Sequence, residues 1–91
     1  MYLHIGQEVT LPHKEILGIF DLDTATVSQI TRDFLREAEQ SGRVRNVCMD
    51  LPRSFVLCKK GMQEPLVYIS QISAATLRKR AENMIAEGVF F

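Results

Sequence analysis

The sequence lacks a long apolar run and a net charge, and we expect no signal peptide; each of these features limits the class of protein. A membrane-spanning helix needs about 18 consecutive apolar residues, and no stretch of the chain approaches that length. Residues 1–4 show neither the basic region nor the apolar core of a signal peptide. Equal numbers of acidic and basic residues argue against a polycation that coats nucleic acid or membranes. We therefore expect a cytoplasmic protein that binds no membrane.

Cysteine and histidine are scarce, which leaves little material for catalysis or metal binding. Cys48 and Cys58 are ten residues apart and match no metal motif, so we expect two unpaired thiols that act as small apolar groups. His4 and His13 belong to no recognisable triad or metal motif. The five glycines are dispersed, which excludes a glycine-rich phosphate loop. We expect no enzymatic activity, no metal, no cofactor and no small-molecule substrate.

What the chain does contain is the pattern of one small globular domain, 1–91, with 46% hydrophobic and 24% charged residues. Apolar or alternating runs predict five to six short strands, at 2–5, 8–11, 16–20, 54–58 and 66–72 and, more weakly, within 43–50. A four- or five-residue loop is expected to join the strands at 54–58 and 66–72 as a hairpin. The predicted fold class is α+β, a small twisted antiparallel or mixed sheet with two amphipathic helices.

The rest of the predicted fold is organised around residues 15–21, Glu-Ile-Leu-Gly-Ile-Phe-Asp. A short apolar run of this kind predicts a strand in the middle of the sheet, buried on both faces or nearly so. Gly18 interrupts the run, which indicates that another group packs closely against the backbone at this position.

The first predicted helix follows this strand. Asp23 and Thr24 are N-cap candidates for a helix that runs to about Gln40, where Ser41 and Gly42 end it. Spacings of three and four residues predict one apolar face, formed by Val27, Ile30, Phe34 and Ala38.

The second predicted helix closes the domain. Ser73 is its N-cap candidate, and the helix is expected from Ala74 to about Glu87, with Gly88 as its end. Its apolar stripe is formed by Leu77, Ala81, Met84 and Ile85. Residues 88–91 then form an apolar tail that either docks onto a groove or lies loose.

Although the net charge is zero, the charges are segregated along the chain. Residues 1–42 hold three basic and seven acidic residues, whereas residues 43–60 hold five basic residues and one acidic residue. This distribution fits either a basic face or an ordinary solvated surface. Cations at strand ends and in loops reach phosphates without reading sequence, and the candidate DNA-binding residues are Lys14, Arg43, Arg45, Arg53, Lys59 and Lys60. One small protomer would bind weakly, so this hypothesis depends on an oligomer that repeats the patch.

Four segments, in the same order, resemble the RemA/RemB family of small bacterial regulators of the extracellular matrix. They are Tyr-Leu-His-Ile-Gly at 2–6, Gly-Ile-Phe-Asp at 18–21, Pro-Arg-Ser at 52–54 and Ser-x-x-Thr-Leu-x-Lys-Arg-Ala at 73–81. The resemblance implies a LytTR-like protomer and a cytoplasmic protein that controls biofilm-matrix genes. It also implies ring-shaped homo-oligomers that bind double-stranded DNA through a basic rim, with a RemA-like protein as an alternative partner.

Carried over by position, the basic residue of the family that precedes the strand at 16–20 falls on Lys14, and the arginine that opens the strand at 54–58 falls on Arg53. The adjacent arginine pair of the RemA branch falls on Asp50 and Leu51, for which Arg43 and Arg45 are the candidate substitutes. Two hypotheses stay open. One is a ring-forming DNA-binding regulator, and the other is an oligomeric protein-interaction module that does not contact DNA.

Overall fold

The computed structural model describes residues 1–48 and 50–86, and it has the expected α+β fold. In chain order its elements are β1 (Tyr2–Gly6), β2 (Val9–Pro12), a 3₁₀ turn (His13–Glu15), β3 (Ile16–Asp21), α1 (Leu22–Ala25), α2 (Gln29–Gln40), β4 (Val44–Asn46), β5 (Ser54–Cys58), β6 (Leu66–Ser70) and α3 (Ala74–Ala86). Within the described residues, no helix is both long enough and apolar enough to span a membrane. The predicted tail at 88–91 lies outside the described residues.

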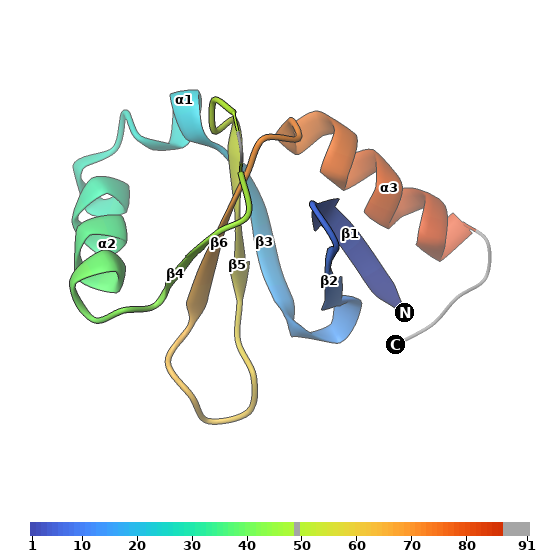
Figure 1. Cartoon of the computed structure of the whole chain (residues 1–91), viewed down its shortest axis with the longest axis horizontal. Coiled ribbons are helices and arrows are strands. Elements are labelled where there is room, and N and C mark those ends of the chain that lie inside the picture. Colours follow the sequence, from blue (N-terminus) through green and yellow to red (C-terminus); the bar gives the residue numbers. More distant parts are fainter. Residues whose placement is uncertain (49, 87–91) are drawn as a thin grey trace.

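The strands divide between two sheets, a division that the sequence did not indicate. β1 and β2 form an antiparallel pair, and the other four strands form a mixed sheet in the order β3-β5-β6-β4. Within this larger sheet β5 is antiparallel to both of its neighbours, and only β4 runs parallel to β6. Figure 1 shows α2 on one side of the larger sheet and the β1–β2 pair with α3 on the other side.

Two apolar clusters fill the two sides of the larger sheet. Because successive side chains of a strand point to opposite faces, β5 contributes to both clusters. Val56 and Cys58 pack with β1, β2 and α3, whereas Phe55 packs with α2. The predicted strand at 54–58 is therefore confirmed, and it is one of the two interior strands, β5 and β6.

The prediction that residues 16–21 form a strand in the middle of the sheet is wrong. β3 is an edge strand with no fully buried residue, and the Leu17 side chain is 59% exposed. A bulge between Ile16 and Gly18 lets Ile16 and Ile19 pack into the same cluster despite their odd spacing. An apolar run reports how many apolar residues a strand has, but it does not report how many neighbouring strands it pairs with.

The close approach predicted at Gly18 is confirmed, and the approaching group is Phe20 on the same strand. A Cβ atom on Gly18 would lie 2.7 Å from the Phe20 ring. That ring in turn stacks on Phe55, with the ring centroids 4.9 Å apart. The bare backbone of Gly18 therefore makes room for the Phe20–Phe55 stack.

Replacement of Gly18 by alanine tests this contact. We expect Gly18→Ala to lower the free energy of unfolding by about 1–3 kcal/mol, because the new methyl group displaces the Phe20 ring. In a Phe20→Ala background the same change should cost much less, and urea unfolding of the four chains measures both costs. Equal costs in the two backgrounds would contradict the contact, as would a Gly18→Ala chain more stable than the wild type.

The single helix predicted from about residue 24 to residue 40 is instead two helices, α1 and α2. The Asp21 carboxylate caps α1 and accepts hydrogen bonds from the backbone N–H groups of Asp23 (2.8 Å) and Thr24 (3.2 Å). The Ser28 hydroxyl then caps α2 and accepts from the Thr31 N–H at 3.5 Å. The chain carries a second N-cap residue inside the apolar pattern, so a new helix begins there.

This break changes the predicted apolar face. Phe34 and Ala38 pack against the sheet, whereas Val27 is 76% exposed and Ile30 is 82% exposed. Periodicity continued the apolar face across the break between α1 and α2, where the chain changes direction.

The last predicted helix is confirmed as α3 within the described residues, with the Ser73 hydroxyl accepting from the Thr76 N–H at 3.2 Å. Leu77, a residue of this helix, is fully buried. The Arg78 guanidinium donates to the carbonyl of Ile19 at 2.8 Å, which attaches α3 to the edge strand β3. For the predicted stripe residues 84 and 85, the structure describes only that they belong to α3.

Two buried hydroxyl groups are satisfied within the core, and that of Ser70 joins the two sheets. The Ser70 side chain, with no exposed surface, donates to the carbonyl of Ile5 and accepts from the N–H of Ile72 at 3.0 Å. The Ser54 hydroxyl, equally buried, donates to the carbonyl of Ile72 at 2.7 Å. These polar groups are tolerated in the core because each has a partner.

Both cysteines are unpaired, as the sequence predicts. Burial, aided by the nearby Glu15 carboxylate, raises the pKa of the Cys58 thiol from 9.0 to about 11. The folded protein therefore holds a proton on Cys58 in a pH range where the unfolded chain releases it. The resulting stabilisation is complete below pH 9 and is lost as the pH rises towards 11.

A Cys58→Ala variant isolates this effect from other alkaline titrations. We expect the stability advantage of the wild type over Cys58→Ala to shrink by roughly 2 kcal/mol between pH 8 and pH 11. Denaturant unfolding of both proteins at several pH values measures the difference. A difference that stays constant over that range would contradict a protonated buried thiol.

Candidate nucleic-acid interface

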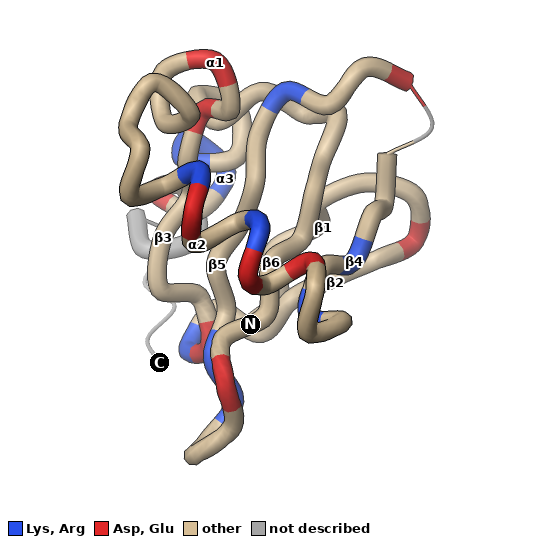
Figure 2. Tube along the Cα trace, turned by 90° about the vertical axis from the view of Figure 1, so that its left-hand side faces the viewer, with Lys and Arg blue, Asp and Glu red and all other residues tan. Residues whose placement is uncertain are grey.

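The six candidate DNA-binding residues come from three parts of the fold, and Arg43 and Arg45 belong to the same part. One is the lysine end, which we define as Lys14, Lys59 and Lys60. The N–H of Lys59 donates to the carbonyl of Glu15 at 2.9 Å, so the 3₁₀ turn and the end of β5 are neighbours. All three lysines are exposed. Glu15 follows Lys14 directly in the chain, and Glu64 comes four residues after Lys60. Figure 2 shows basic and acidic segments interleaved along the trace, so the charge there is mixed.

Arg53 lies at the opposite end of the same strand. The five residues of β5 span roughly 17 Å, which separates Arg53 from Lys59 by about that distance. The backbone N–H of Arg53 donates to the carbonyl of Ser70 at 2.9 Å, and the Arg53 carbonyl accepts from the N–H of Leu22 at 3.1 Å. These backbone contacts hold the exposed Arg53 next to the acidic start of α1.

Arg43 follows α2 and has a structural role. Its Nε donates to the Ser41 hydroxyl at 2.8 Å, and an Nη donates to the carbonyl of Pro65 at 2.7 Å. The guanidinium carbon lies 6.0 Å from the centroid of the half-buried Phe34 ring, within cation–π distance. Arg43 thus ties the end of α2 to the start of β6.

Arg45, on the edge strand β4, remains exposed. One Nη donates to the carbonyl of Gly42 at 2.7 Å, a local contact that leaves the rest of the guanidinium open to water. The two arginines predicted to replace the pair that falls on Asp50 and Leu51 therefore differ, since Arg43 stabilises the fold and Arg45 adds surface charge.

Alanine substitution separates these two roles. We expect Arg43→Ala to lower the free energy of unfolding by about 1–3 kcal/mol, because the Pro65 carbonyl loses a charged donor. Arg45→Ala should change it by less than about 0.5 kcal/mol, as is usual for an exposed side chain. Chemical unfolding of both variants makes the comparison, and equal losses would refute the distinction.

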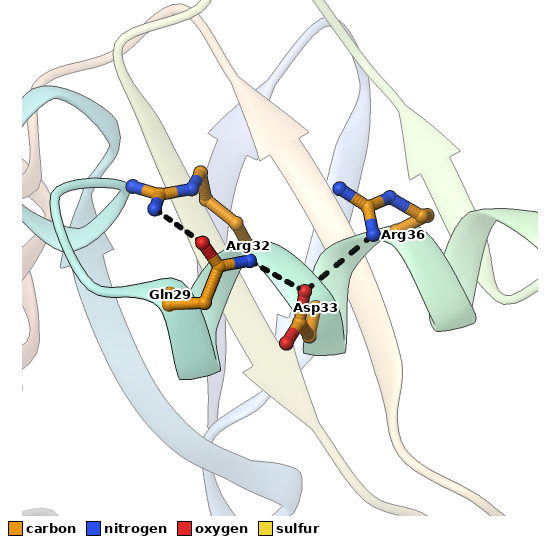
Figure 3. Close-up of polar contacts among 4 residues, drawn as sticks. All are labelled: Gln29, Arg32, Asp33 and Arg36. Atoms are coloured by element: carbon orange, nitrogen blue, oxygen red, sulfur yellow. Dashed lines mark hydrogen bonds and ion pairs between the residues drawn. The ribbon is translucent and has the colours of Figure 1, made fainter.

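The two arginines of α2 were not singled out by the sequence, and Figure 3 shows their contacts. Gln29 accepts from Arg32 at 2.7 Å and donates to Asp33 at 2.8 Å, and Arg36 pairs with the same Asp33 carboxylate at 3.5 Å. Arg32 also donates to the carbonyls of Thr26 and Val27. Spacings of three and four residues give the signal for such contacts on one helix face.

A further surface feature was missed, namely an open apolar groove between α2 and the edge of the larger sheet. It has a volume of about 240 Å³ and is lined by Phe20, Ile30, Thr31, Phe34, Phe55 and Leu57. We call it the α2 groove. The exposed Ile30 could have indicated it only if the break between α1 and α2 had been known.

Within residues 1–48 and 50–86, no three histidine, cysteine or acidic side chains gather as a metal site would require. The described surface carries cations mixed with acids, and it includes the apolar α2 groove.

No family model matches the chain. The chain is 33% identical over 84 residues to extracellular matrix regulatory protein B of Bacillus subtilis (strain 168), and the match covers 92% of this chain and 94% of that protein. The chain belongs to the family of extracellular matrix regulatory protein B, RemB, as its four characteristic segments predicted.

Proposed function

We propose that this protein is a bacterial regulator of extracellular-matrix formation. The observation that carries the proposal is the match to extracellular matrix regulatory protein B, which extends over 92% of the chain. Fold alone would not support it, because one small α+β fold serves many functions.

For the mechanism, we propose that an oligomeric ring of this chain binds double-stranded DNA. Phosphates would be held by the lysine end, by Arg45 and by Arg53, which are all exposed. Arg43 would contribute its charge while holding α2 in place. Contacts of this kind position a protein on DNA and carry no sequence information.

The separation of these cations is the physical reason for requiring an oligomer. A protomer of zero net charge, with cations at opposite ends of β5, engages only a few phosphates at a time. A symmetric assembly repeats each cation at regular intervals, and linked contacts raise the affinity far above that of one protomer.

Removal of single cations tests the DNA contact. We expect Arg53→Ala and Lys59→Ala each to weaken binding to unrelated duplexes alike and to reduce the slope of log affinity against log salt by about 1. Gel shifts over a salt series measure both quantities. Arg36→Ala is the matched control, because Arg36 is exposed but paired with Asp33 on α2.

The DNA proposal is wrong if Arg53→Ala and Lys59→Ala behave like the Arg36→Ala control. It is also wrong if the oligomeric wild type gives no shift at low salt.

A second candidate function is a protein-interaction module that does not contact DNA. Two observations favour it, the acidic residues interleaved with the lysine end and the open α2 groove. In that case a RemA-like protein is the proposed partner. The same salt series separates the candidates, because a protein-interaction module predicts no DNA affinity.

A further inference from the structure

The α2 groove exists because the helix covers only part of its side of the larger sheet. α2 packs mainly over β6, whereas the groove lies over β3 and β5. Its floor contains the stacked rings of Phe20 and Phe55, and its rim carries Ile30 with 82% of its surface exposed. The other side of the sheet is covered by the β1–β2 pair and α3 (Figure 1). An open, almost wholly apolar groove is a place where an apolar group can be buried.

The sequence holds a segment of matching chemistry, Val89-Phe90-Phe91. Phenylalanine rings bury a large area and pack well against other aromatic rings, such as those of Phe20 and Phe55. The segment is also the one apolar stretch noted in the sequence for which the described fold provides no role.

The groove of the same protomer is out of reach of this segment. Residues 87–91 span at most about 17 Å from Ala86, even when fully extended. Ala86 lies eight residues, roughly 12 Å, along α3 beyond Arg78, the residue attached to Ile19 on β3. The segment would have to return over that distance and then cross to the opposite side of the sheet, which adds about 10 Å.

We propose that the α2 groove binds Val89, Phe90 and Phe91 of a second copy of this chain. The contact joins two different surfaces, so each copy offers one groove and one segment. Head-to-tail contacts of this kind form a closed ring when the rotation between neighbours closes, and an open filament otherwise. The inference rests on the proposed oligomeric function and names the interface that builds the oligomer.

Two complementary variants test the proposal in the full chain. Ile30→Glu places a charge on the rim of the groove and leaves the segment intact. A Phe90→Ser/Phe91→Ser chain has an altered segment and an intact groove. We expect each variant alone to be monomeric by light scattering, at about the 10.4 kDa of one chain. Mixed together, they should form a dimer that grows no further, because the pair has one intact groove facing one intact segment.

Met62→Glu is the matched control, because Met62 is 99% exposed in the β5–β6 loop and lies outside the groove. It should assemble like the wild type, and circular dichroism should show that all variants keep the fold. The proposal is overturned if the segment variant assembles normally, if the mixture stays monomeric, or if the wild type is itself monomeric at tens of micromolar.

The outcomes separate this inference from the proposed function. A wild type that assembles and shifts DNA, while the mixture stays monomeric, removes the interface and keeps the DNA-binding oligomer. A mixture that dimerises, with a wild type that never shifts DNA, keeps the interface and removes the DNA contact.

Discussion

The rest of the structure depends on burying β5 and β6 from both sides at once. Val56 and Val67 have no exposed surface, yet they belong to different apolar clusters on opposite faces of the same sheet. A domain of this size can cover both faces only with every other element it has. α2 is therefore used on one side, and the β1–β2 pair and α3 are used on the other. The Ser70 hydroxyl donates to a carbonyl of the β1–β2 pair, and the Ser54 hydroxyl donates to the carbonyl of Ile72 before α3.

This constraint decides where charge can be placed. β5 and β6 carry no charged residue, so the cations are confined to strand ends, edge strands and helix surfaces. Several of the arginines there hold the fold together by donating to backbone carbonyls, as Arg43 and Arg78 do. The exposed cations that remain are divided between the two ends of β5 and the edge strand β4, and they lie among acids. A protomer built in this way can bind a long, regular polyanion firmly only by being repeated, which links the proposed function to assembly.

The sequence predicted most of the fold where the local signal and the tertiary position agree. The run at 54–58 is mostly apolar, and it is buried on both sides. The N-cap at Ser73 and the close approach at Gly18 also follow from local chemistry that the fold preserves. Residues 16–21 misled because an edge strand with a bulge can be as apolar as an interior strand. The helix break was missed because the Ser28 cap lies inside an apolar pattern that continues through it.

The candidate site was less accessible to prediction than the fold. Residue type identifies cations, but only the tertiary contacts show that Arg43 donates to Pro65 while Arg53 stays exposed. The approach of Lys14 to Lys59 depends on how β3 pairs with β5, which no local pattern encodes. The α2 groove likewise results from a helix that covers half of a sheet face. Membership of the RemB family was predicted because it depends on the sequence itself.

The central proposal is that DNA is held by the repeated cations of an assembly and not by one protomer. Native mass spectrometry of the protein mixed with a short duplex at low salt tests this most directly, because it counts the protomers bound to each DNA molecule. We expect complexes that contain one whole assembly per duplex. We expect no complex of a duplex with a single protomer, even at protein concentrations where free protomers are present. An abundant complex of one protomer with one duplex would contradict it.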